Sequence, residues 1–371
     1  MLSAFNSQKF RFWSFISMVL LVFVHGYNLN ESYLQPWTIP HETFTPTGFV
    51  EYWLANGLLR FRIPMLFIIS GYLFALGDYK SYKQRCAKRV KTLLYPYLIW
   101  SAAGLLLTYV LELSFYGKNI VVATRMMQID ESRTLLHQYH WYEAVARWIF
   151  FPVSYQLWFI RVLLIYNLAY PALRWCVTHP KAKWIFFSFV FLFWLSTAGL
   201  ILIEGEGLLF FSLGIWMQKT NFNIDTPNKW LLPKYWIIIF LGLSVFKTIL
   251  AFNIYFDGIE PVLLIMHKLV VGSGLICAWY GADLVVKYCM NKKWFVWLSA
   301  FSFMIYVLHA PLVVYANKAI FSEINHWAGY RILTFILLPL CLIILSVLFG
   351  ALFRKYLPAV YSFVTGGRGL I

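Results

Sequence analysis

Charged side chains are scarce in this chain. Only 12% of its 371 residues are Asp, Glu, Lys or Arg, whereas 61% are hydrophobic, and an ordinary soluble domain has roughly twice that charged fraction. Acidic residues are the scarcer sign, with 15 Asp and Glu against 31 Lys and Arg. This composition excludes an ordinary soluble globular protein and predicts a polytopic membrane protein, whose aromatic residues anchor at the lipid headgroups.

Several chemistries lack their sequence signatures. None of the five cysteines forms a CxxC pair, so neither a disulfide framework nor a metal site is predicted. No glycine-rich phosphate loop occurs near the basic segments. The net charge of +16 does not gather in a separate basic domain, which argues against nucleic-acid binding. Lys and Arg instead indicate loops held on the cytoplasmic side and contact with anionic membrane lipid.

Long apolar runs predict an all-α, polytopic transmembrane bundle of about ten helices, because only helices satisfy the backbone in lipid when no barrel-like alternation is present. We expect one membrane domain over residues 1–371 and no separate soluble domain. Lys9 and Arg11 precede the first run without a small-residue cleavage site, which predicts an uncleaved first span. The predicted spans are approximately 10–28, 61–78, 92–114, 154–176, 184–203, 206–219, 231–251, 260–288, 294–317 and 331–354.

Loop charge predicts the orientation. With the N-terminus inside, the richest Lys/Arg clusters fall on the cytoplasmic side, so both termini are expected to be cytoplasmic. Two long loops then lie outside, residues 29–60 and 115–153. The first contains a stretch, 49–61, expected to lie along the interface as a helix. Aromatic residues in these loops suit both interfacial anchoring and stacking on sugar rings: Trp37, Trp53, Trp141 and Tyr155.

Ionisable residues inside the apolar runs are the best functional signal. At about 1.5 Å per residue, His25 and His309 both fall in the outer third of their helices. Imidazole is the side chain best suited to proton transfer near neutral pH. Intramembrane ionisable groups are costly unless paired or used. The alternative is that each is a hydrogen-bonded core residue. The same predicted layer holds Arg161, Arg62 and Glu112.

A second cluster lies on the predicted cytoplasmic side. It consists of Arg85, Lys88, Arg89 and Lys91, shortly before Pro96. Anchoring by the positive-inside rule explains such a cluster. A phosphate site explains it equally well, because clustered cations pair directly with polyphosphate.

Four ordered segments make the chain resemble the membrane acyltransferase-3 family, the many-spanning O-acyltransferases of bacterial surface sugars. The segments run from Phe15 to His25, from Arg62 to Leu98, from Leu157 to Arg161 and from Ser302 to Pro311. The family's first motif is an Arg, ten residues, then a His. Ser14 stands at the Arg position, and Arg11, one turn earlier and about 40° away around the helix, is expected to supply the charge. Thr92 replaces the second Arg of the basic RxxR motif, beside Lys91.

The resemblance implies a multi-pass enzyme of the bacterial inner (plasma) membrane, with acyl-CoA as its donor substrate and no tightly bound cofactor. It implies acetyl as the acyl group and a carbohydrate or glycolipid acceptor at the outer face. Arg11, Arg85, Lys88, Arg89 and Lys91 would bind the CoA phosphates. His25 would be the general base, Arg161 an oxyanion donor, and His309 an orienting or proton-releasing group. The expected substrate-binding residues are Arg62, Tyr72, Trp158 and Tyr306, the last a further oxyanion donor.

Other mechanisms and functions stay open at this point. An acyl-histidine route competes with direct transfer. Ser70 as a nucleophile is disfavoured, because it lacks the GxSxG elbow, and Ser70-Gly71 suits close helix packing better. A polysaccharide exporter or other transporter without acyl transfer would also place His and Arg in a membrane, although no inverted repeat is evident. The sequence indicates neither the acceptor nor the oligomeric state.

Overall fold

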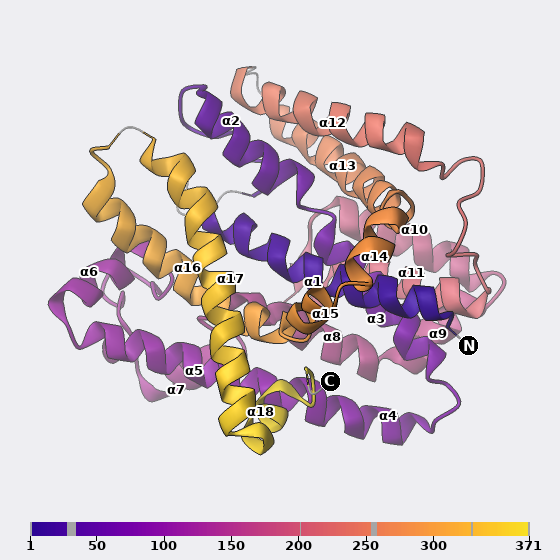
Figure 1. Ribbon diagram of the computed structural model, residues 1–371, viewed down its shortest axis with the longest axis horizontal. Coiled ribbons are helices and arrows are strands. Elements are labelled where there is room, and N and C mark those ends of the chain that lie inside the picture. Colours follow the sequence, from indigo (N-terminus) through magenta and orange to yellow (C-terminus); the bar gives the residue numbers. More distant parts are fainter. Residues whose placement is uncertain (1, 28–34, 201, 254–257, 328, 370–371) are drawn as a thin grey trace. The chain divides into compact units, whose positions relative to one another are not determined.

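The computed structural model describes residues 2–27, 35–200, 202–253, 258–327 and 329–369 (Figure 1). Within these ranges the regular structure is helical except for one antiparallel hairpin, in which β1 (Gly199–Leu200) pairs with β2 (Ile203–Glu204). The predicted all-α fold is therefore confirmed. The chain divides into two compact units, which are Met1–Leu20, Leu34–Arg89 and Val162–Ser299 in the first, and Leu21–Tyr33, Val90–Arg161 and Ala300–Ile371 in the second. The single membrane domain expected over residues 1–371 stays a prediction.

Seven helical segments among the described residues are long and apolar enough to cross a membrane. A bent pair, Tyr155–Leu168 and Tyr170–Thr178 at 68°, makes eight if it counts as one span. The predicted fifth and sixth spans are helices of only 14 and 15 residues. The polytopic architecture is confirmed, whereas the count of ten stays a prediction. The seven segments are Ala4–Gly26, Pro46–Leu76, Tyr82–Glu112, Pro233–Asn253, Ile259–Gly281, Ser302–Ile324 and Tyr330–Tyr356.

In the first unit, a close crossing joins α3 (Arg62–Leu76) to α11 (Gly205–Lys219). A Cβ on Gly71 would lie 2.1 Å from the Phe211 carbonyl oxygen, and one on Gly214 would lie 2.2 Å from that of Ile68. Two glycines therefore let the backbones touch, as the Ser70-Gly71 pattern predicts. The other elements here are the first part of α1 (Ala4–Gly26), α2 (Pro46–Tyr52), the π-helix Trp53–Leu58, α4 (Tyr82–Arg89), most of α8 (Trp158–Leu168), α9 (Tyr170–Thr178), α10 (Ala182–Leu195), α12 (Pro233–Asn253), α13 (Ile259–Gly281), α14 (Asp283–Met290) and α15 (Lys293–Ser299).

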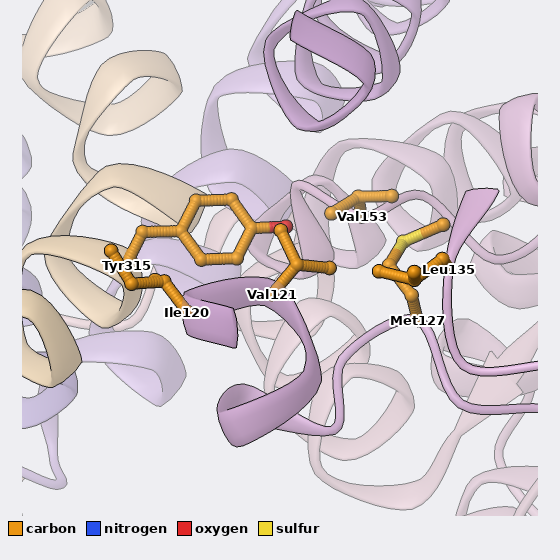
Figure 2. Packing of buried hydrophobic residues seen from close by; sticks show 6 residues of the cluster. All are labelled: Ile120, Val121, Met127, Leu135, Val153 and Tyr315. Atoms are coloured by element: carbon orange, nitrogen blue, oxygen red, sulfur yellow. The ribbon is translucent and has the colours of Figure 1, made fainter. Parts of the chain in front are cut away.

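The second unit folds a segment that was expected to be a loop. Residues 115–153 contain two α-helices and a 3₁₀ turn. Figure 2 shows their buried side chains in one cluster with Tyr315, which lies next to Ile120 and Val121. The Tyr315 hydroxyl lies 2.9 Å from that of Thr108. The unit's elements are the end of α1, the π-helix Val90–Leu94, α5 (Tyr95–Glu112), α6 (Phe115–Thr124), the 3₁₀ turns Leu136–Gln138 and Tyr155–Leu157, α7 (Trp141–Ile149), the start of α8, α16 (Ser302–Ile324), α17 (Tyr330–Tyr356) and α18 (Pro358–Thr365).

Candidate functional site

His25 occupies the penultimate position of α1 and is half-buried. The residue after it fastens this helix end within the second unit. The Asn317 side-chain amide donates to the Gly26 carbonyl oxygen at 3.0 Å. A Cβ on Gly26 would lie 2.8 Å from Pro339 Cγ, so only glycine lets α17 approach so closely. The imidazole is thus placed by backbone contacts with α16 and α17.

The second unit brings the two predicted histidines together. The rings of His25 and His309 are stacked, with centroids 5.4 Å apart and planes inclined by 22°. Tyr155 lies edge-on to His25, with a centroid distance of 4.9 Å. His309 is 1% exposed, and its Nδ1 lies 3.1 Å from the Ile305 carbonyl oxygen. That contact is a hydrogen bond when Nδ1 carries the proton, which leaves Nε2 as the basic nitrogen. We call His25 and His309 the histidine pair.

A kink in α16 directly follows His309. Ala310 has non-helical backbone angles, φ −121° and ψ 138°, before Pro311. Proline has no N–H, so the Val307 carbonyl loses its helical donor. The buried Gln156 amide replaces it, because Nε2 lies 3.3 Å from the Val307 oxygen and 2.8 Å from the Ala310 oxygen. The Tyr306 hydroxyl donates to the Gln156 carbonyl at 2.6 Å, which locks the two segments together beside the pair.

The other predicted site residues of the second unit have varied surroundings. Tyr306 joins the pair, with its ring 6.3 Å from that of His309. Trp158 contacts Phe159, whose ring lies 6.3 Å from that of Tyr306. The Arg161 guanidinium instead donates to the Phe150 carbonyl and lies near the Tyr97 hydroxyl. These contacts connect Arg161 to the segment that precedes α8.

Glu112, the fifth ionisable group of the predicted outer layer, has a structural task. Its Oε1 accepts from the Leu136 N–H at 2.7 Å and its Oε2 from the His137 N–H at 3.1 Å. The His137 ring Nδ1 lies 2.9 Å from the same Oε2. The carboxylate therefore caps the 3₁₀ turn Leu136–Gln138.

The cytoplasmic cations form a pocket in the first unit. A cavity of about 200 Å³, which we call the basic pocket, opens beside α3 and α4. Three of the predicted phosphate-binding residues line it, together with Lys80, which was not predicted. Lys91 is exposed and belongs to the second unit. The lining residues are Leu73, Phe74, Gly77, Tyr79, Lys80, Arg85, Lys88 and Arg89.

Asp78 organises the cations around this pocket. It pairs with Arg85 at 2.7 Å and Arg174 at 3.2 Å, and also with Lys219. The Tyr170 hydroxyl donates to both carboxylate oxygens at 2.8 Å. Burial raises the pKa of Asp78, but Lys219, Tyr170 and Arg85 outweigh burial and hold this pKa below its ordinary value. Asp78 was not among the predicted residues, although its position as the one acid between Arg62 and Glu112 is a usable signal.

Three of the predicted site residues contact other parts of the first unit. Arg11 donates to the Ser299 hydroxyl and the Val296 carbonyl, each at 2.8 Å, at the C-terminal end of α15. Arg62 is buried and donates to the Leu59 carbonyl at 2.6 Å. Tyr72 packs edge-on against Phe10 and lines an apolar cavity of about 300 Å³. Their predicted roles toward donor and acceptor stay predictions.

The structure also reveals ionisable residues in predicted spans that the sequence analysis did not single out. Lys247 in α12 and the neighbours His267 and Lys268 in α13 are all at least 93% buried. Their signal is the same as that of His25, namely a titratable side chain inside an apolar run.

The fold and these sites define an integral, polytopic membrane protein with a stacked histidine pair in one unit and a basic pocket in the other. The family model described as "Acyltransferase domain" matches residues 10–355. The chain therefore belongs to this family, the acyltransferase-3 group that its motifs resemble. It is 27% identical over 368 residues to the succinoglycan biosynthesis protein ExoH of Rhizobium meliloti (strain 1021), with 94% of this chain and 89% of that protein covered. No solved structure matches the chain.

Proposed function

We propose that the protein transfers an acyl group from acyl-CoA to a hydroxyl of a carbohydrate or glycolipid at the outer face of the bacterial inner membrane. The observation that carries the proposal is the stacked histidine pair, 5.4 Å between ring centroids, in a chain of an acyltransferase family. The relative named for succinoglycan biosynthesis supports a polysaccharide acceptor. Acetyl is the proposed acyl group, taken from the family resemblance.

His25 is the general base of the proposed reaction. It is the half-buried member of the pair, and this partial exposure supports its assignment as the residue that meets the acceptor. Its neutral imidazole takes the proton of the acceptor hydroxyl, and the oxygen attacks the thioester carbonyl. The carbon–sulfur bond breaks, CoA thiolate leaves, and the proton passes from the imidazole to this thiolate. His309, buried with a basic Nε2, orients His25 or assists the proton release.

The basic pocket is the proposed site for the donor's phosphates. Lys80, Lys88 and Arg89 line it beside Arg85, whose charge is shared with Asp78. Three cations beyond that pair suit a polyphosphate. The donor is a substrate in this proposal, and a tightly bound cofactor is not part of it.

The test uses purified full-length protein, radiolabelled acetyl-CoA and a polysaccharide acceptor. We expect label to enter the polysaccharide and CoA to be released. His25→Ala should lower this rate roughly 100-fold or more, because removing a general base costs about that much. His326→Ala changes an exposed histidine and should have no effect. An unchanged rate in His25→Ala overturns the mechanism, and polysaccharide export without any CoA release supports the transporter alternative.

A further inference from the structure

A second group of ionisable side chains lies inside the apolar helices of the first unit. Helices α12 and α13 run side by side (Figure 1), and they carry Lys247, His267 and Lys268, which are 0%, 3% and 7% exposed. Neither the histidine pair nor the basic pocket includes them. Buried ionisable groups in apolar helices are costly and usually functional, so their partners decide what they can bind.

Lys247 has fewer hydrogen-bond acceptors among the described residues than its ammonium group can use. Its Nζ donates to the Asn56 carbonyl oxygen at 2.8 Å and lies 5.2 Å from the centroid of the Tyr52 ring. An ammonium group has three donors. The charged group that acts on it is Arg60, of the same sign. Among the described residues, therefore, no carboxylate balances the charge of Lys247.

His267 lies in equally positive surroundings. Its Nδ1 is buried and has no hydrogen-bond partner among the described residues. The groups with the largest electrostatic influence on it are Lys247, Arg60, Lys268 and Arg62, all cationic. The half-buried Trp37 ring lies 5.8 Å from the imidazole. An unpartnered polar nitrogen among cations is what an anion site would contain.

Lys268 differs because carboxylates balance it. Glu206 and Glu204 act on its charge, and the ammonium lies 4.7 Å from the centroid of the Trp194 ring. The Trp194 indole N–H donates to Glu206 Oε2 at 3.3 Å. Burial and the neighbouring Glu206 raise the pKa of Glu204 to about 7, so that carboxylate is only partly charged at neutral pH. Lys247 and His267 are thus the two members of this group on which no carboxylate of the described residues is seen to act.

We propose that Lys247 Nζ and His267 Nδ1 form an anion site that binds the carboxylate or phosphate of an acidic carbohydrate acceptor. The proposal rests on the proposed function, in which the acceptor is a carbohydrate. A cation buried without a counter-ion is unfavourable, and an anion relieves this cost, whereas a neutral sugar does not. The Trp37 ring, 5.8 Å from the His267 imidazole, offers a face for the sugar. Trp37 is half-buried and marks the side from which the acceptor arrives.

The test measures binding by the thermal unfolding of full-length protein in detergent, without any acyl donor. The probes are glucuronate, glucose 6-phosphate, inorganic phosphate and glucose. We expect saturating glucuronate or glucose 6-phosphate to raise Tm by about 2 °C or more, and glucose to have no effect. Lys247→Met and His267→Phe should each abolish the rise. Lys88→Gln in the basic pocket should keep it.

Four outcomes overturn the proposal: no rise at saturating acidic sugar, an equal rise with glucose, a rise that survives both Lys247→Met and His267→Phe, or a rise that Lys88→Gln abolishes. A rise with inorganic phosphate alone overturns the acidic-sugar assignment. Measuring the Tm shift and acyl transfer on the same wild-type protein separates this proposal from the proposed function. A retained Tm shift without acyl transfer by wild-type protein contradicts only the proposed function, and acyl transfer without any shift contradicts only the anion site.

Discussion

His309 is the residue whose chemistry is best defined by its contacts. Its Nδ1 meets the Ile305 carbonyl, so Nε2 is the nitrogen left for proton transfer. His309→Asn places an amide N–H near Nδ1 and removes Nε2. We expect this variant to keep the bond to Ile305 but to lower kcat roughly 100-fold, with the donor KM unchanged. Steady-state acyl transfer at varied acetyl-CoA concentration measures both constants.

His137→Asn is the matched control for this substitution. The His137 Nδ1 also meets an oxygen, that of Glu112, at 2.9 Å, and the ring is outside the histidine pair. Its kcat should equal that of the wild type. A kcat for His309→Asn within about threefold of wild type would assign His309 to packing instead of proton transfer.

The common depth of His25 and His309 could be predicted from the sequence, whereas the contact between their rings could not, because depth does not say which helices are neighbours. His25 and His309 lie in runs of the same predicted direction, at the same distance from the start of each. Gln156 could not be predicted, because its importance comes from carbonyls that a kink in another helix leaves without donors. For Arg161 the residue type was a usable signal, but its partner could not be predicted, because the guanidinium donates to a carbonyl eleven residues earlier in the chain.

At the scale of elements, Asp78 joins the α3–α4 turn to α9 and α11. Its pKa is lower in the folded chain than its ordinary value. The ionised carboxylate therefore stabilises the fold above about pH 4, and this contribution disappears as the pH falls through the folded-state pKa. Asp78→Asn should lower Tm at pH 7 by roughly 3 °C or more, and the difference from wild type should shrink below about pH 4.

Differential scanning calorimetry in detergent between pH 3 and pH 8 checks this prediction. Glu131→Gln removes an exposed carboxylate and serves as the control, with Tm unchanged across the range. A Tm difference for Asp78→Asn that stays constant down to pH 3 would show that the carboxylate's charge does not stabilise the fold.

The crossing of α3 and α11 depends on two glycines. A Cβ on Gly71 meets a backbone oxygen at 2.1 Å, and backbone cannot move aside as a flexible side chain can. Gly71→Ala should therefore destabilise the protein by about 1–3 kcal/mol through overpacking. No atom of the described residues lies within 4 Å of the position that a Cβ would take on Gly242 in α12, so Gly242→Ala should be neutral or stabilising. Urea or thermal unfolding compares the two, and equal stability would contradict the crossing.

Elements were predictable to the extent that hydropathy dictates them. Most long apolar runs form helices, because lipid forces the backbone to pair with itself. The predicted span 184–203 is helical only to Leu195 and continues into the β1–β2 hairpin, and the span 154–176 is a bent pair of helices. The segment 115–153 was expected to be a loop, since its helices are short. In α7, Trp141 and Tyr142 are exposed while Glu143 pairs with Arg133. Such a helix depends on contacts that hydropathy does not predict.

At the scale of the whole molecule, loop charge predicts the orientation in the membrane. The positive-inside rule places the α3–α4 turn in the cytoplasm and residues 115–153 outside. Two exposed positions report on these sides, because Tyr79 is 81% exposed and Trp141 is 79% exposed. After the five native cysteines are replaced by alanine, a membrane-impermeant maleimide should label Trp141→Cys in spheroplasts with an intact inner membrane. It should label Tyr79→Cys only after these are lysed.

The two variants control one another, because each must be labelled in detergent to show that its thiol is accessible. The predicted pattern would put the basic pocket on the side where cytoplasmic acyl-CoA is found, since Tyr79 lines that pocket. A reversed pattern would put the pocket outside. It would then contradict the assignment of the pocket to a cytoplasmic donor, while the contacts within the histidine pair would be unaffected.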